Sequence, residues 1–282
     1  MFFLYQRNFF PKFANHQMHQ PEPQNSATLP IAIFDSGIGG LSVLREAVKI
    51  LPFENYIYYA DTDHVPYGNK TKEEVKSLVL NAGSFLDQQK IKMMVIACNT
   101  ATSSAIKELR GKYSYPVLGM EPAVKPAVSN NKNKRVLVLA TELTLKEQKF
   151  RELVDKVDNE KIVDMLPLPE LVSFAEQFIF DDATVIPVLR QKFSSLNLED
   201  YGTVVLGCTH YPFYKDVLRK IFPRGTEIID GNSGTVAHMK NLLEENNLVN
   251  KQEVKGEIVF YHSGKKITAK ADLTRYRDLA GL

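Results

Sequence analysis

The sequence of 282 residues has little cysteine: only Cys98 and Cys208 are present. Two cysteines are too few for a disulfide framework, and this scarcity predicts a reducing, cytoplasmic setting. No apolar run approaches the length of a membrane-spanning helix, so no membrane association is expected. Lysine and arginine do not gather into a basic stripe, and the formal net charge is only +2. The sequence therefore gives no indication of nucleic-acid binding.

Residues 1–29 differ in composition from the rest of the chain. Aromatic residues crowd the first part, and a stretch rich in glutamine, proline and asparagine follows. Arg7 and its polar neighbours interrupt any apolar core of a signal peptide. This composition predicts a flexible extension over 1–29 that carries none of the chemistry.

From Ile31 onward, short apolar segments alternate with amphipathic helical ones, which is typical of βα units in parallel sheets covered by helices. The expected strands of the first half are 31–34, 56–60 and 93–98. A similar series recurs in the same order at 135–141, 162–166 and 203–208. The recurrence predicts an internal duplication that gives two similar α/β domains, each with a parallel sheet.

The length of the chain also favours about two domains. We expect residues 30–121 and 231–282 to form the first domain and residues 122–230 to form the second. The segment 256–261 reads as a late strand that returns to the first domain.

The two cysteines have equivalent settings. Each follows an apolar strand and a small residue, and each is followed by hydrogen-bonding residues and a helical pattern, which after Cys208 begins near Pro212. Open α/β sheets bind ligands at the carboxyl ends of their strands, and a helix N-terminus next to a thiol lowers its pKa. A single buried cysteine is about as often structural as reactive. The repeated setting indicates a paired chemical role.

The segment Asp35–Gly40 follows the first strand and opens a helix, and its glycines permit close approach to a ligand. It lacks the Lys-Ser/Thr of a phosphate loop, and its spacing differs from the dinucleotide fingerprint Gly-x-Gly-x-x-Gly. Asp35 would repel phosphate and suits an ammonium group or a proton-handling role.

Further polar residues lie near the expected strand ends. His210, two positions after Cys208, could act as a base partner or orient an acid, although a single histidine is usually a structural hydrogen bonder. Glu170 and Glu176 are candidate carboxylates, with an ordinary solvated glutamate as the default for each. The candidate ligand contacts beside the thiols and in the Val-Pro-Tyr-Gly loop are Tyr67, Gly68, Asn99, Thr100 and Thr209.

Four segments together resemble the glutamate racemases of the cofactor-independent aspartate/glutamate racemase family. They are Phe34–Gly40, Val65–Gly68, Ala97–Ala101 and Leu206–Pro212, and the resemblance extends from about Ile31 to beyond Gly234. It implies two pseudo-symmetric α/β domains with the active site in the cleft between them. It also implies interconversion of L- and D-glutamate without pyridoxal phosphate or a metal, supplying D-glutamate for peptidoglycan synthesis in a bacterial cytoplasm.

The resemblance also implies roles for individual residues. Two acid/base groups on opposite faces of Cα remove a proton from one side and return one to the other. By resemblance, Cys98 deprotonates D-glutamate with the help of Asp35, and Cys208 deprotonates L-glutamate with the help of Glu176 and His210. The residues expected to hold the substrate are Asp35, Ser36, Tyr67, Gly68, Asn99, Thr100, Thr209 and His210.

The choice between the two glutamates depends on a weaker match. The family pattern Val-Pro-x-x-Glu fits Val172–Glu176 with serine in place of proline, which favours Glu176 over Glu170. We expect Ser173 to begin a helix as its N-cap, with Glu176 at the N3 position. Pro167 and Pro169 are expected to keep the preceding chain extended, so that Glu170 points away.

Three other interpretations stay open. The nearest is a racemase of the same family that acts on aspartate or a hydantoin. A cysteine hydrolase with Cys208 as nucleophile and His210 as base would leave Cys98 without a role. A non-catalytic amino-acid-binding protein would need neither thiol. The sequence does not distinguish a monomer from a homodimer.

Overall fold

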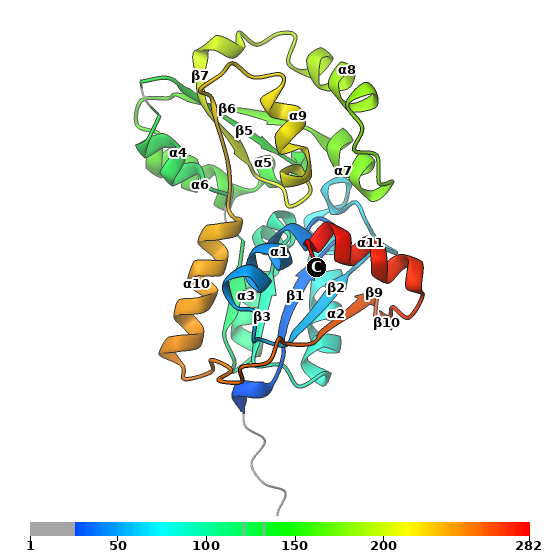
Figure 1. Ribbon diagram of the computed structural model, residues 1–282. Helices are drawn as coiled ribbons and strands as arrows, with labels where there is room; N and C mark the ends of the chain where they lie inside the picture. Colours follow the sequence, from blue (N-terminus) through cyan, green and yellow to red (C-terminus); the bar gives the residue numbers. More distant parts are fainter. Residues whose placement is uncertain (1–25, 121, 132) are drawn as a thin grey trace, which may run out of the picture.

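A computed structural model describes residues 26–120, 122–131 and 133–282 (Figure 1). Most of the predicted extension, residues 1–25, lies outside the described residues. Its last part is a 3-10 turn, η1 (Ser26–Thr28), that is hydrogen-bonded to the folded body. No helix within the described residues is both long and apolar enough to cross a membrane.

The first sheet has six strands in the order β10-β9-β2-β1-β3-β4. Every neighbouring pair is parallel except β10 with β9. The predicted late strand does return to this sheet, because β9 pairs with β2 along its length. The strands are β1 (Ile31–Asp35), β2 (Tyr56–Ala60), β3 (Met93–Ile96), β4 (Val117–Gly119), β9 (Ile258–His262) and β10 (Lys265–Lys266).

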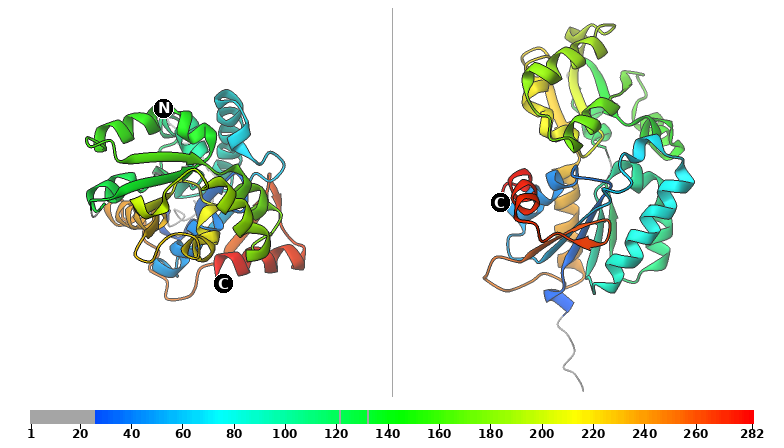
Figure 2. Two further views of the ribbon diagram at one scale, coloured as in Figure 1. Left: turned by 90° about the horizontal axis from the view of Figure 1, so that it is seen from above. Right: turned by 90° about the vertical axis from the view of Figure 1, so that its right-hand side faces the viewer.

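Helices cover both faces of the first sheet, as Figure 2 shows. Alternate strand residues such as Ile33 and Tyr58 pack toward α1, α10 and α11, whereas Phe34 and Tyr59 pack toward α2 and α3. Burial on both faces explains why these strands read as nearly continuous apolar runs. The helices are α1 (Leu41–Ile50), α2 (Lys72–Gln88), α3 (Asn99–Lys112), α10 (Asn232–Glu245) and α11 (Lys270–Ala280).

The second sheet has four parallel strands in the order β6-β5-β7-β8. They are β5 (Arg135–Ala140), β6 (Val163–Pro167), β7 (Tyr201–Leu206) and β8 (Glu227–Asp230). The helices of this half are α4 (Val124–Ser129), α5 (Glu142–Lys146), α6 (Gln148–Val157), α7 (Pro169–Glu176), α8 (Asp182–Lys192) and α9 (Lys215–Arg219). Three 3-10 turns complete the fold: η2 (Tyr67–Asn69), η3 (Leu198–Asp200) and η4 (Tyr211–Tyr214).

The two sheets share one strand order. The series β2-β1-β3-β4 in the first corresponds to β6-β5-β7-β8 in the second. The prediction of two similar parallel-sheet α/β units is therefore confirmed. The domain limits at 121/122 and 230/231 stay a prediction, and α10 begins just beyond the second of them.

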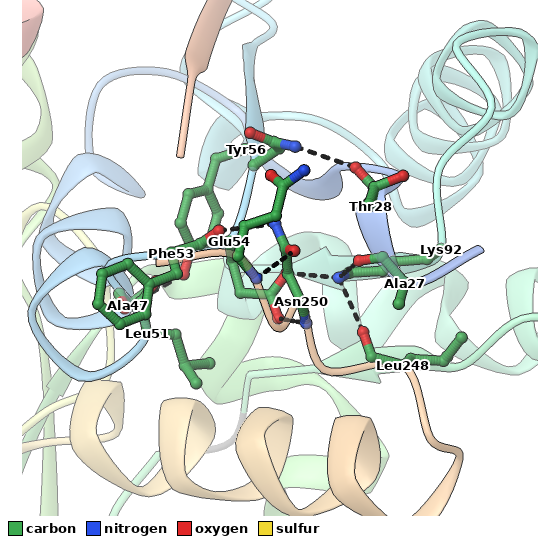
Figure 3. Close-up of polar contacts among 12 residues, drawn as sticks. Ala27, Thr28, Ala47, Leu51, Phe53, Glu54, Tyr56, Lys92, Leu248 and Asn250 are labelled. Atoms are coloured by element: carbon green, nitrogen blue, oxygen red, sulfur yellow. Dashed lines mark hydrogen bonds and ion pairs between the residues drawn. The ribbon is translucent and has the colours of Figure 1, made fainter. Parts of the chain in front are cut away.

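A buried ion pair lies at the amino-terminal end of the first sheet (Figure 3). Lys92 and Glu54 are 1% and 2% exposed, and the Lys92 ammonium also donates to the carbonyl groups of Ala27 and Leu248. Glu54 accepts the backbone N–H of Asn250 at 2.8 Å. This cluster ties η1 and the segment after α10 to the end of the sheet that is opposite to the cysteines.

Candidate active site

Both cysteines lie just beyond the carboxyl ends of corresponding strands, Cys98 after β3 and Cys208 after β7. Both are free thiols, and both line one cavity where the two halves of the molecule meet. The space open to the centre of a water molecule in this cavity is about 10 Å³. The lining residues are Ser36, Tyr67, Gly68, Cys98, Asn99, Thr100, Thr141, Val172, Gly207, Cys208, Thr209 and His210.

Cys98 is the N-cap residue of α3. Its sulfur accepts the N–H of Ala101 at 3.4 Å and the hydroxyl of Ser36 at 3.6 Å. Burial raises the pKa of the Cys98 thiol to about 12, and the charge of Asp35 adds to this, whereas the two hydrogen bonds lower it. The N–H at the start of α3 does lower the pKa of Cys98, as expected, but desolvation of the thiolate outweighs this effect.

The chain after Cys208 also differs from the prediction. The expected helix near Pro212 is the 3-10 turn η4, and α9 begins only at Lys215. The Cys208 sulfur instead lies 3.6 Å from Nδ1 of His210. The support for this thiol thus comes from a side chain rather than from a helix N-terminus.

His210 connects Cys208 to Glu176. Its Nε2 lies 2.6 Å from Oε1 of Glu176, and the same carboxylate oxygen accepts the backbone N–H of Ile38 at 2.8 Å. Burial, the largest effect, lowers the pKa of the His210 imidazole, but the hydrogen bonds to Cys208 and Glu176 together raise it well above its ordinary value. The imidazole of His210 thus lies between the Cys208 sulfur and the Glu176 carboxylate.

Asp35 ends β1 and is fully buried. Its carboxylate accepts the N–H of Gly37 and the hydroxyl of Thr209, both at 2.9 Å. Burial is the main reason that the pKa of Asp35 rises to about 6. The Cys98 sulfur is hydrogen-bonded by Ser36, whereas Asp35 acts on this thiol through its charge, which raises the pKa of Cys98.

The structure corrects the local reasoning for Glu176. Helix α7 begins at Pro169, so Ser173 lies inside the helix and Glu176 is its last residue rather than its N3 residue. Proline is favoured at the first helical position, and Pro169 occupies it here. Glu176 nevertheless reaches His210, whereas Glu170 forms an ion pair with Lys192 at 2.6 Å.

The remaining predicted contacts line the cavity in different ways. Oδ1 of Asn99 is buried and has no hydrogen-bond partner among the described residues. It is therefore free to accept a hydrogen bond from a ligand. The Tyr67 hydroxyl points away to Oδ2 of Asp61, at 2.6 Å. The Thr100 hydroxyl bonds those of Thr141 and Thr144, at 3.0 and 3.1 Å.

The sequence reasoning missed Thr141, which lines the cavity from the end of β5. The repeat could have identified it, because β5 corresponds to β1 and Thr141 follows that strand as Ser36 follows β1. It also missed Ser42, whose hydroxyl donates to the Thr209 carbonyl at 3.0 Å and joins the two halves. Across the described residues, no three His, Cys, Asp or Glu side chains form a group that could hold a metal ion.

Comparison with known proteins gives a consistent result. Residues 39–239 match the family model of the Asp/Glu/hydantoin racemases. The chain is 54% identical over 249 residues to a glutamate racemase of Halothermothrix orenii, covering 88% of this chain and 98% of that protein. It is 49% identical over 253 residues to glutamate racemase 2 of Bacillus subtilis, covering 89% and 95%.

Solved structures are similar over nearly the whole chain. The Escherichia coli glutamate racemase in complex with L-glutamate and the activator UDP-MurNAc-Ala has a TM-score of 0.76 and 30% identity, and the match covers 88% of this chain and 95% of that one. The Francisella tularensis glutamate racemase in complex with D-glutamate has a TM-score of 0.77 and 28% identity, covering 91% and 95%.

Proposed function

The chain belongs to the Asp/Glu/hydantoin racemase family, and from this premise we propose that it is an isomerase that interconverts L-glutamate and D-glutamate. One observation carries the proposal: two free thiols from corresponding strands of a duplicated fold line a single cavity. Relatives that are 44–54% identical and are named glutamate racemases favour glutamate over aspartate or a hydantoin as substrate.

The reaction follows from two acid/base groups on opposite faces of Cα. With L-glutamate, the Cys208 thiolate removes the Cα proton, and the Cys98 thiol donates its proton to the other face. The product is D-glutamate, and the enzyme is left with Cys208 protonated and Cys98 as thiolate. D-glutamate reverses these roles. The high pKa of Cys98 supports its assignment as the proton donor for the L isomer.

His210 and Glu176 are proposed to support Cys208. The Glu176 carboxylate holds a proton on His210, and the resulting imidazolium stabilises the thiolate form of Cys208. Asp35 is proposed to serve the Cys98 side and the substrate ammonium group. Hydroxyls, an amide and backbone N–H groups at the start of α3 are proposed to hold the substrate. The residues that supply or flank these groups are Ser36, Tyr67, Gly68, Asn99, Thr100 and Thr209.

A cavity of about 10 Å³ has room for roughly one water molecule, which is far less than glutamate needs. Substrate entry therefore requires the two halves to separate. The bonds that must lengthen include Thr209 with Asp35, Ile38 with Glu176, and Ser42 with the Thr209 carbonyl. Reclosure then excludes water from the thiols and strengthens their electrostatic contacts.

We expect no pyridoxal phosphate to take part, because the thiols exchange the proton with Cα directly. D-glutamate made in this way would serve peptidoglycan synthesis, in a cytoplasmic setting. A homodimer is one assembly compatible with this site, which is built from residues of a single chain.

Circular dichroism of purified protein tests the function. Incubation with L-glutamate or with D-glutamate should bring either solution to the same, nearly zero, signal. L-aspartate and a 5-substituted hydantoin are the matched alternatives and should keep their signals over the same period. If aspartate or the hydantoin is racemised and glutamate is unchanged, that compound is the substrate instead of glutamate. If none of the three changes, the protein is not a racemase of these compounds.

A further inference from the structure

Asp61 is a buried carboxylate close to the cavity but outside its lining. It follows β2 and is 3% exposed. Its Oδ2 accepts the hydroxyl of Tyr67 at 2.6 Å, and its Oδ1 accepts the hydroxyl of Ser263 at 2.9 Å. The Nδ1 atom of His64 lies 2.9 Å from the same Oδ1. The Asp61 carboxylate thus accepts hydrogen bonds both from η2 and from the turn between β9 and β10.

The turn η2 forms one part of the cavity wall where the two halves touch. Tyr67 and Gly68 line the cavity, and a side chain at Gly68 would meet Thr141 of the second half at about 3.0 Å. A small shift of this turn would therefore open or obstruct the cleft. The hydroxyl of Tyr67 is hydrogen-bonded to Asp61, so Asp61 contributes to the position of the turn.

The partner of Asp61 in the last hairpin has an unusual backbone. Ser263 has φ of 40°, a left-handed conformation that is uncommon for residues other than glycine. Its N–H donates to the Ala60 carbonyl at 2.8 Å, and its hydroxyl accepts the N–H of Asp63 at 3.0 Å while donating to Asp61. Unfavourable backbone conformations persist where surrounding contacts over-determine them, often at functional sites.

We propose that Asp61 is a positioning residue for the racemase reaction, and that Ser263 holds Asp61 in place so that η2 forms the substrate-binding wall. The proposal rests on the proposed function, because it assumes that glutamate occupies this cavity. It also assigns a role to the hairpin after β9, which lies beyond the residues 39–239 that match the family.

Steady-state kinetics of Asp61→Asn, Tyr67→Phe and the double variant test the proposal. Asparagine keeps the size of the side chain but loses the charge that accepts the Tyr67 hydroxyl. KM for both enantiomers should rise about tenfold in Asp61→Asn, the effect of weakening a charged hydrogen bond, with kcat changed less than about threefold. The double variant should be no worse than the poorer single variant, because both changes break one contact. Additive effects on KM would overturn the coupling.

Two substitutions at Ser263 separate positioning from general stability. Ser263→Ala and Ser263→Gly both remove the hydroxyl, but glycine also relieves the left-handed backbone, so its melting temperature should be the higher of the two. KM should rise equally in both. Lys90→Gly is the control, since Lys90 is exposed, has φ of 56° and lies at the opposite end of the sheet. It should gain stability with KM unchanged. A KM that follows melting temperature across these variants would overturn the proposal.

A crystal structure of Asp61→Asn decides the case independently of activity. The proposal predicts that Tyr67 and Gly68 move relative to Thr141, and an unmoved turn would overturn it. Failure of the unmodified enzyme to racemise glutamate would instead count against the proposed function, and the two failures are therefore distinguishable.

Discussion

The surroundings of Cys98 and Cys208 differ although the strands that carry them correspond. Cys98 caps a 14-residue helix and is hydrogen-bonded by a hydroxyl and a backbone N–H. Cys208 precedes a 3-10 turn and contacts an imidazole backed by a carboxylate. The two sheets share the strand order and the position of the thiol, whereas the groups that control proton affinity differ on the two sides.

This difference suits a two-base reaction. One side favours the neutral thiol, because burial raises the pKa of Cys98 to about 12. The other side places a charged imidazole beside the sulfur. The proposed mechanism requires such a difference, because one cysteine must accept the Cα proton while the other donates one.

Replacing each cysteine with serine should have the largest effect on racemisation. A serine hydroxyl is a much weaker acid than a thiol, so racemisation should fall by roughly 10²–10⁴-fold in either variant. Loss of Cα–H exchange should be greater for D-glutamate in Cys98→Ser and greater for L-glutamate in Cys208→Ser. Exchange measured by NMR in D₂O checks this, and equal losses for both isomers in both variants would contradict separate bases.

Changing the carboxylate behind His210 should lower kcat/KM for both enantiomers, because an equilibrium constant of one between them keeps the two values equal. Glu176→Gln keeps the shape but loses the charge that holds a proton on His210, so kcat/KM for L-glutamate should fall by about 10–100-fold. Glu170→Gln is the matched control on the same helix, because Glu170 pairs with Lys192 and Glu176 pairs with His210. It should change turnover by less than about twofold. Impairment of Glu170→Gln with Glu176→Gln unaffected would reverse the assignment.

The buried carboxylate on the Cys98 side should be visible in the pH dependence of stability. The pKa of Asp35 is about 6 in the folded protein, above the ordinary value of 3.8. A raised folded pKa gives a contribution to stability that is full below pH 3.8 and is lost as the pH rises to about 6. Asp35→Asn should therefore gain melting temperature relative to the unmodified protein between pH 4 and pH 7. A difference in melting temperature between the two proteins that stays constant from pH 4 to pH 7 would contradict the assignment.

The smallest effect on turnover is expected far from both thiols. Lys92→Met leaves Glu54 buried and unpaired, so the free energy of unfolding should fall by about 3 kcal/mol while the kinetics of the folded enzyme stay unchanged. Lys220→Met, which breaks the exposed pair with Asp182, is the control and should cost less than about 1 kcal/mol. Denaturant unfolding and a racemase assay on the same samples measure both quantities.

Local patterns in the sequence were enough to predict the parallel sheets, the two similar units and the positions of both cysteines. Alternation of apolar strands and helical segments gave the parallel sheets, and the repeat gave two units with a shared strand order. The positions of Cys98 and Cys208 at strand ends followed from the same pattern, since carboxyl ends of parallel strands lie at one edge of a sheet.

Contacts between the halves could not be predicted in this way. The bond from Thr209 to Asp35 joins residues that are 174 positions apart, and that from Ile38 to Glu176 joins residues 138 apart. The pKa of Cys98 depends on the depth of burial, which no local pattern gives. The position of Glu176 at the end of α7 was misjudged because Ser173 resembles an N-cap while Pro169 is the true start.

Racemisation in D₂O tests the central claim, two separate bases, most directly. In the early phase of conversion of protiated L-glutamate, the proposed mechanism predicts D-glutamate carrying deuterium at Cα and remaining L-glutamate that still carries protium. The reason is that the abstracted proton stays on Cys208 while Cys98 donates a proton already exchanged with solvent. Deuterium appearing in the remaining L-glutamate as fast as in the product would show a single base serving both faces, and would contradict the account.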